Sequence, residues 1–385
     1  MRPRYLYTVM LLMTAGNGAV SLVLADLEDA FDVSSTGVGL VAATGFLAAL
    51  AGHVGLAPVV DRGHSGTVAF AAVAMAVAGS LLFGLGGGLW FFVAGRAMAG
   101  AGLGIFGVTA HKALVGRDGE GGGARLGLLL SAGVAGFISG PVIGAIFGGL
   151  SFAAPFVVLA AGLALAGVPA VRFVAQAEVA AAPVRFRELA AVTRHAGVQA
   201  ALLTQVTVYG LIGLFNGTVD RYLTDLGVST TAIAVSLMII GFPLLTLPRW
   251  TGALSERNGG GAVMVPALVV AVPVAAAYGV ISGVVTFVLV GLAHAVVESF
   301  ASMGAQLLVL ETVGPQRAAV GNGALSLASM STAAVTAGLG PVVYARFGEV
   351  VLFGGWAVIT GIILAAVMLL LRAGPSSDGE RSSAR

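Results

Sequence analysis

The amino-acid sequence predicts an all-α polytopic membrane protein whose twelve transmembrane helices form two pseudo-symmetric bundles of six. Composition, the one-sided placement of basic residues and an internal repeat each support this prediction. The 385 residues are 58% hydrophobic and 9% charged, whereas soluble domains are about 25% charged. One span with its loop takes roughly 30 residues, so the length allows roughly twelve spans. The absence of cysteine excludes disulfides and cysteine metal sites.

Twelve apolar segments follow one another, each long enough to cross the hydrocarbon core. Arg2 and Arg4 precede the first segment, and no small-residue cleavage site follows it, so we interpret that segment as a span rather than a signal peptide. The predicted spans are 5–25, 37–58, 67–86, 89–110, 126–148, 151–171, 198–217, 230–250, 262–282, 285–307, 322–343 and 351–371.

Basic residues fall almost entirely on the side of the membrane that holds the N-terminus. Those on this side are Arg2, Arg4, Arg62, Lys112, Arg117, Arg125, Arg172, Arg185, Arg187, Arg194, Arg249, Arg257, Arg317, Arg372, Arg381 and Arg385. The opposite side carries only Arg221 and Arg346. The positive-inside rule therefore places both termini in the cytoplasm of a cell (inner or plasma) membrane, with an even number of spans.

The longest internal hydrophilic segment lies near the middle of the chain and carries Arg185 and Arg187 beside Pro183. We expect it to lie along the inner membrane surface as a short amphipathic linker. The predicted units are an N-terminal bundle (1–171), this cytoplasmic linker (172–197), a C-terminal bundle (198–372) and a flexible cytoplasmic tail (373–385).

The two predicted bundles repeat each other at an offset close to half the chain length. An acid-arginine pair follows the second span as Asp61-Arg62 and the eighth as Glu256-Arg257. A Gly-Pro pair lies in the fifth span as Gly140-Pro141 and in the eleventh as Gly340-Pro341. Repeats of this kind place a transporter's binding site between the halves, near the middle of the bilayer.

The fifth span carries small residues and one proline at fixed spacing, namely Gly127, Gly136, Gly140, Pro141 and Gly144. Small residues let neighbouring backbones approach closely in lipid. The spacing resembles the antiporter motif in the fifth helix of drug/proton exporters of the major facilitator superfamily, except that Ala145 replaces a second glycine. The resemblance implies a bend that seals one end of a central cavity. The alternative is a tightly packed span with no further role.

The loop after the eighth span, from Gly252 to Gly259, resembles the loop signature of the same superfamily. Its counterpart retains Asp61 and Arg62 but lacks the flanking glycines. The resemblance implies that Asp61, Arg62, Glu256 and Arg257 gate the two bundles through charge-assisted hydrogen bonds. The alternative is that these charges only set the topology.

Ionisable residues inside the membrane are costly, and each requires an explanation. Arg96 in the fourth span precedes closely spaced glycines, which resembles a superfamily motif whose arginine takes part in proton transfer. It could instead extend to the outer surface or hold helices together. Glu298 and His294 lie on one face of the tenth span, and we predict that Glu298 carries the coupling proton. The alternative is a buried His–Glu hydrogen bond that ties helices together.

Neutral polar residues in the first and seventh spans supply the candidate substrate cavity. They are Asn17, Gln205, Tyr209 and Asn216. The first span lacks the acidic residue that similar exporters often carry. We expect Asp220 and Arg221 to be solvated at an outer mouth.

These features predict a monomeric secondary transporter, not an enzyme, that exports small, largely apolar molecules in exchange for protons. No phosphate-binding loop or hydrolase signature is present. We therefore expect no cofactor beyond the proton gradient, and no partners beyond substrate, protons and membrane lipid, with nucleic acid excluded. The alternatives are a superfamily uptake symporter or uniporter for a sugar or organic acid, and a non-transporting sensor with the same fold.

Overall fold

The computed structural model describes residues 3–60, 64–115, 122–176 and 186–373, and these are almost entirely helical. The first half of the chain forms α1 (Arg4–Val20), α2 (Leu24–Asp29), α3 (Ser35–Val60), α4 (Ser65–Leu85), α5 (Leu89–Val115), α6 (Gly122–Gly148) and α7 (Ala154–Ala175). The second half forms α8 (Phe186–Val192), α9 (Ala196–Asp225), α10 (Thr230–Thr246), α11 (Pro248–Asn258), α12 (Gly260–Ala277), the 3₁₀ turn η1 (Tyr278–Val280), α13 (Val284–Val313) and α14 (Pro315–Ala373).

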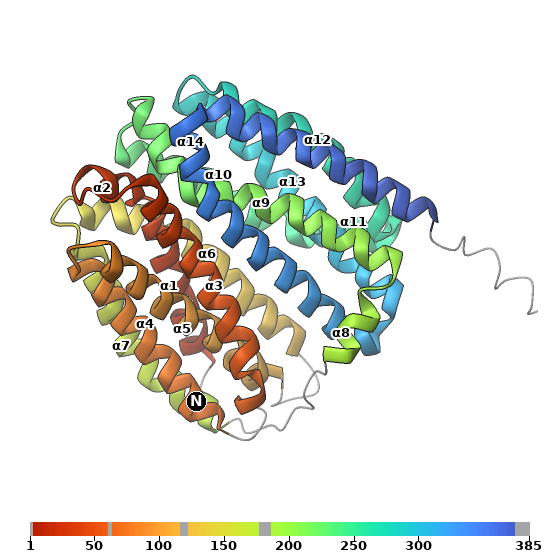
Figure 1. The fold of residues 1–385 in the computed structure, drawn as a ribbon. Helices are drawn as coiled ribbons and strands as arrows, with labels where there is room; N and C mark the ends of the chain where they lie inside the picture. The colour runs from red at the N-terminus through yellow and green to blue at the C-terminus, as the bar shows by residue number, and fades with distance from the viewer. Residues whose placement is uncertain (1–2, 61–63, 116–121, 177–185, 374–385) are drawn as a thin grey trace, which may run out of the picture.

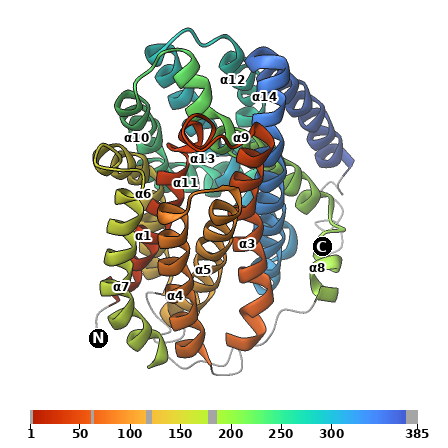
Figure 2. The ribbon, with the colours of Figure 1, turned by 60° about the vertical axis from the view of Figure 1, so that its left-hand side comes forward.

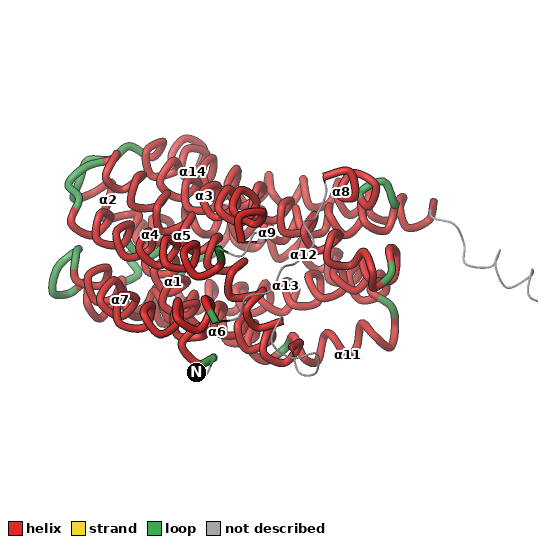
Figure 3. The backbone as a smooth tube through the Cα atoms, turned by 90° about the horizontal axis from the view of Figure 1, so that it is seen from below, coloured by secondary structure: helices red, strands yellow, loops and turns green. Residues whose placement is uncertain are grey.

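The helices gather into two bundles that follow chain order. In Figure 1, α1 to α7 occupy the lower left and α9 to α14 the upper right, and Figure 2 shows the same division after rotation. Figure 3 shows the backbone of both bundles as a tube, seen from below, with its helices in red. In Figure 1 the short helix α2 lies at the left, whereas α1 begins near the bottom and α14 ends at the right. We call the end that carries α2 the outer end.

Length and composition agree with a membrane protein. In the described part of the chain, nine helices are long and apolar enough to span a bilayer, and α10 with α11 adds a tenth across a 42° bend. One of the nine, α14, contains a break at Gly348, where φ is 78°, so it consists of two helical segments. The predicted all-α polytopic fold is confirmed.

The structure changes the boundaries of four predicted spans. The first ends at Val20, and α2 follows only after a turn in which the Ser21 hydroxyl donates to the carbonyl of Gly18 over 2.8 Å. The eighth is the bent pair α10 and α11. The last two are joined through Gly348, because a glycine at positive φ changes chain direction without leaving a loop.

The internal repeat recurs as a packing contact. A Cβ built on Gly18 of α1 would lie 3.0 Å from Cδ of Pro141 in α6. In the second half, a Cβ on Gly217 of α9 would lie 3.1 Å from Cδ of Pro341 in α14. Each bundle therefore packs its first helix against its fifth through a glycine opposite a Gly-Pro pair.

Part of the predicted linker lies outside the described residues. Of the remainder, the structure forms α8 at Phe186–Val192, and Val192 is buried with residues of α9, α12, α13 and α14. The linker's described end therefore packs on the second bundle.

The two bundles meet from the outer end to about the middle of the helices. A Cβ on Gly39 of α3 would overlap the carbonyl of Gly338 in α14, and one on Gly241 of α10 would overlap the side chain of Ile138 in α6. Leu22 of the first half is buried in the hydrophobic cluster of the second half. These contacts join the two halves over the part of the molecule that carries α2.

Candidate transport site

Arg96 lies buried in α5 and faces α1. Its side chain is 5% exposed, and Nη1 donates a hydrogen bond of 2.5 Å to Oδ1 of Asn17. The guanidinium packs against the backbone of Gly45 in α3, because any side chain at that position would meet its Nε at 2.8 Å. Nε has no hydrogen-bond partner among the described residues. Arg96 was predicted to take part in proton coupling and Asn17 to line the substrate cavity. The structure shows that they form one polar contact inside the first bundle.

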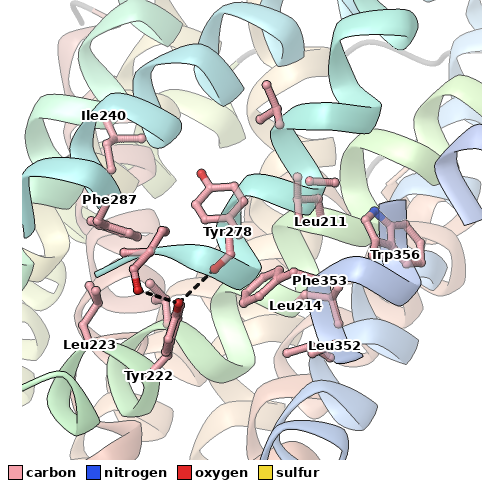
Figure 4. Packing of buried hydrophobic residues seen from close by; sticks show 14 of the residues in the cluster. Leu211, Leu214, Tyr222, Leu223, Ile240, Tyr278, Phe287, Leu352, Phe353 and Trp356 are labelled. Atoms are coloured by element: carbon pink, nitrogen blue, oxygen red, sulfur yellow. Dashed lines mark hydrogen bonds between the residues drawn. The ribbon is translucent and has the colours of Figure 1, made fainter. Parts of the chain in front are cut away.

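His294 lies in α13 and faces the start of the η1 turn. Its Nδ1 lies 3.1 Å from the hydroxyl of Tyr278, and its Nε2 is buried with no hydrogen-bond partner in the part of the chain that the structure describes. The Tyr278 backbone is itself held by Tyr222, whose hydroxyl donates to the Tyr278 carbonyl over 2.9 Å, as Figure 4 shows. An aromatic layer that includes Phe215 and Phe287 surrounds this pair. The histidine ring is thus held in one orientation by its surroundings.

Glu298 lies one turn beyond His294 on α13. Both line a narrow pocket whose other walls are largely apolar, with Thr207 of α9 and Trp356 of α14 facing it. Trp356 Nε1 is also buried without a partner. A carboxylate in a pocket of this kind has few groups to stabilise its charge, so its protonation state responds strongly to whatever enters the pocket.

The predicted proton-coupling residues divide between the two bundles. His294 and Glu298 share one pocket, but the described part of the chain gives them no hydrogen bond to each other. Arg96 is bonded to Asn17 instead of Glu298. Arg96 and Glu298, both predicted to take part in proton coupling, therefore have no hydrogen bond to each other in this conformation.

The predicted substrate residues of α9 differ in whether their polar atoms are already hydrogen-bonded within the protein. Gln205 is buried, and no described residue donates a hydrogen bond to its Oε1. Tyr209 packs with Val208, Ala267 and Ala301 in a small apolar cluster. Asn216 donates to the carbonyl of Ile212 in its own helix over 3.0 Å. Gln205 is consequently the residue of this set with an unused buried acceptor.

The glycines of α6 differ in how closely they approach α1. A Cβ on Gly136 would overlap the carbonyl of Leu11, and one on Gly140 would lie 2.7 Å from the Ala19 nitrogen, so both face α1 at close range. A Cβ on Gly144 would meet the flexible end of the Leu22 side chain at a tight 3.3 Å, whereas one on Gly127 would meet no neighbouring helix among the described residues. The predicted motif thus acts here mainly as a helix-packing surface, and α6 continues as one helix through Pro141.

Of the predicted gating residues, Glu256 and Arg257 lie exposed near the end of α11. In the described part of the chain neither forms an ion pair. Asp61 and Arg62 lie outside the described residues. The predicted gating by these four residues stays a prediction.

The expectation that Asp220 is solvated is wrong. Its side chain is 3% exposed, which makes it the only carboxylate that is buried among the described residues. Its position near the end of the seventh span suggested a solvent-exposed mouth, but α2 of the other half folds back over it. The sequence analysis missed that the first span ends early and that α2 follows it. The run of Asp and Glu after Val23 could have indicated this break.

Comparison with known proteins decides the family. A family model described as Major Facilitator Superfamily matches residues 6–337. The chain belongs to the major facilitator superfamily. Proteins of this superfamily are transporters of small molecules and not enzymes, so the prediction that the chain is no enzyme is confirmed, and a small-molecule substrate and a multi-pass membrane location are supported. No curated protein matches the sequence.

Solved structures agree with this family assignment at the level of the fold. A bacterial homologue of the human lysosomal transporter Spinster, in an inward-facing and unoccupied conformation, superposes with a TM-score of 0.73 at 14% identity, over 97% of this superfamily member and 94% of that chain. The nucleoside transporter NupG gives a TM-score of 0.75 at 14% identity, over 97% and 100% of the two chains. Identities this low show the fold alone.

Proposed function

We propose that the protein exports small, largely apolar molecules across the cell membrane in exchange for protons. The observation that carries this proposal is the pocket of Glu298, which combines one carboxylate and one histidine with mainly apolar walls. In this conformation the pocket has only about 10 Å³ of free volume, so an apolar substrate enters it only when its walls separate. The carboxylate supplies a group whose charge changes on protonation.

Coupling follows if substrate and proton compete for the same pocket. A deprotonated Glu298 favours substrate occupancy, and a protonated one releases it, so each ligand alters the binding of the other by the same factor. His294, with its free Nε2, relays the proton to or from Glu298. Arg96 acts from the first bundle by fixing α1 and α5 through Asn17.

The few free polar groups disfavour the uptake of a sugar. Asn216 is bonded within its own helix, and Asn17 is bonded to Arg96. A sugar site requires many hydrogen bonds, because each buried hydroxyl that lacks a partner costs free energy. Both termini in the cytoplasm, as the basic residues predict, would make the end that carries α2 the external one.

Inside-out vesicles with an acid lumen test the proposal. Lipophilic cations and antibiotics are added one at a time, and proton release from the lumen is followed with wild type and with Glu298→Gln. We expect at least one compound to discharge the gradient with wild type, and a loss of about tenfold or more in rate with the variant.

Two other outcomes redirect the proposal. If wild type and Glu298→Gln discharge the proton gradient at equal rates, the protein is still an antiporter, but Glu298 is not its proton site. Discharge by neither, with folded protein present in the membrane, favours uptake or a non-transporting role.

A further inference from the structure

Two polar side chains of α14 line the Glu298 pocket and have no role in the proposed export mechanism. Trp356 and Thr360 are one helical turn apart, so they lie on one face of α14. His294 and Glu298 have the same spacing on α13 and line the same pocket. Two helices of the second bundle therefore each contribute a pair of polar side chains to one small space.

Three atoms of these side chains are buried and lack a hydrogen-bond partner among the described residues. They are Nε2 of His294, Nε1 of Trp356 and Oγ1 of Thr360. The three side chains are 8%, 8% and 1% exposed. Because a buried polar atom that forms no hydrogen bond is costly, three such atoms around one pocket indicate that they share a partner.

The orientation of Trp356 is fixed by α9. A Cβ built on Gly210 would overlap Cζ2 and Cη2 of the indole ring, so the ring occupies the space that a side chain at position 210 would need. Leu211 of the same helix also lines the pocket, and Figure 4 shows it beside Trp356. The close contact with Gly210 holds the indole, and with it the N–H group, in one position.

The free space of the pocket matches one water molecule. It is about 10 Å³, and a buried water needs about 10–15 Å³ together with several polar partners. The indole N–H of Trp356 is a donor, the carboxylate of Glu298 is an acceptor, and the hydroxyl of Thr360 can be either. A metal cation fits less well, because the indole N–H can only donate.

We propose that Trp356 and Thr360 hold one water molecule between Glu298 and His294, and that this water carries a proton from one to the other. The proposal rests on the proposed function, because it takes Glu298 as the proton site. It explains how His294 can relay a proton although no hydrogen bond joins these two side chains in the described structure.

The proton transfer balances with the histidine as acceptor. In the tautomer that this requires, Nδ1 of His294 donates to the hydroxyl oxygen of Tyr278, 3.1 Å away, and the lone pair of Nε2 is free. The Glu298 carboxyl gives its proton to the water oxygen, and the water gives one of its own protons to Nε2. An O–H bond is broken and an N–H bond is formed, which leaves a carboxylate, an imidazolium and an unchanged water.

Glu298 is the end of this relay that solvent reaches. It is partly exposed, whereas His294 is buried. The other titratable groups that interact with Glu298 are Tyr209 of α9 and Tyr278 of η1, and tyrosines keep their protons near neutral pH. A substrate that separates the pocket walls displaces the water and breaks the path to His294, which links proton movement to substrate occupancy.

Infrared difference spectroscopy of the reconstituted protein tests for the water directly. Spectra at mildly acid and mildly alkaline pH are subtracted, once in ordinary water and once in water enriched in the heavy isotope of oxygen. The O–H band of a bound water shifts with the isotope, whereas bands of the protein do not. We expect wild type to show such a band with an intensity that depends on pH, and Glu298→Gln to lose this pH dependence.

Two variants test the residues that hold the water. Trp356→Phe keeps an aromatic ring beside α9 but removes the N–H, and Thr360→Val removes the hydroxyl at similar volume. We expect both variants to lose the isotope-sensitive band. The rate of substrate-evoked proton release in vesicles should fall about tenfold in Trp356→Phe, and about fivefold in Thr360→Val, which is typical of one hydrogen bond.

The matched controls make the same changes away from the pocket. Trp250 is an exposed residue of α11, and the hydroxyl of Thr336 in α14 donates to the carbonyl of Thr332. We expect Trp250→Phe and Thr336→Val to keep both the isotope-sensitive band and the wild-type rate of proton release.

A wild-type spectrum without an isotope-sensitive band that responds to pH overturns the proposal, even where the variants do not fold. A band that persists unchanged in folded Trp356→Phe and Thr360→Val overturns it as well. The vesicle assay separates this result from the proposed function. The band without substrate-evoked proton release retains the water relay and rejects export, whereas proton release without the band does the reverse.

Discussion

The two halves of the molecule repeat one helix-packing contact but differ in the ionisable side chains that they hold inside the bundle. Gly18 against Pro141 in the first half corresponds to Gly217 against Pro341 in the second. On this common scaffold the first half buries the cation of Arg96 beside Asn17. The second half instead places His294 and Glu298 in a pocket. Helix packing in lipid requires only small residues at the contact, so the polar residues are free to diverge between the halves.

Removing the partner of Arg96 should produce the largest effect. Asn17→Ala removes the hydrogen-bond acceptor of the buried Arg96 guanidinium, and we expect the free energy of unfolding to fall by about 3 kcal/mol. SDS titration of the protein in mixed micelles measures this change.

The double variant Asn17→Ala/Arg96→Met is the control for that prediction. It removes the buried charge along with its acceptor, and stability should return to within about 1 kcal/mol of wild type, because an apolar pair of similar volume replaces the polar contact. A single variant as stable as wild type would show that Arg96 finds another acceptor.

Replacing the two repeated glycines, Gly140 and Gly340, with alanine should lower the free energy of unfolding by different amounts in the two halves. At Gly140 the new methyl group would meet the backbone nitrogen of Ala19 at 2.7 Å, whereas at Gly340 it would meet the hydroxyl oxygen of Thr218 at the same distance. A side chain rotates more readily than a helix backbone shifts. We expect Gly140→Ala to cost about 2 kcal/mol and Gly340→Ala less than about 1 kcal/mol in the same titration.

Gly127→Ala provides the control for both glycine variants. No atom lies within 4 Å of the added methyl group, and alanine favours a helix by up to about 1 kcal/mol over glycine. Stability should be unchanged or slightly higher. Equal losses at Gly140 and Gly340 would mean that the two contacts are alike in energy as well as in geometry.

The smallest effect is expected at the hydroxyl that orients His294. Tyr278→Phe removes the 3.1 Å contact to Nδ1, and we expect a loss of about 1 kcal/mol in unfolding free energy. Tyr5→Phe, whose hydroxyl accepts only an exposed bond from Arg4, should change stability by less than about 0.5 kcal/mol. A loss at Tyr278 no larger than at Tyr5 would indicate that the aromatic layer alone positions the histidine.

Part of the candidate site could be predicted from the sequence, because a charged residue within an apolar segment is conspicuous. Arg96, His294 and Glu298 were identified in this way, and so was the small-residue face of α6. The pairing of Arg96 with Asn17 could not be predicted, since it joins α5 to α1 and depends on how those helices are rotated about their axes. Tyr278 was missed because a tyrosine at the end of a span usually marks only the membrane interface.

The sequence by itself determined that the chain lies in a membrane, is helical and repeats itself, because the cost of exposing polar backbone to lipid leaves a long apolar segment few other conformations. Only the tertiary structure decided which charges are buried. Asp220 lies at the end of its helix, where sequence position indicates solvent, yet α2 covers it from the other half of the chain. Burial of a helix end depends on contacts between segments distant in sequence, and no local pattern records them.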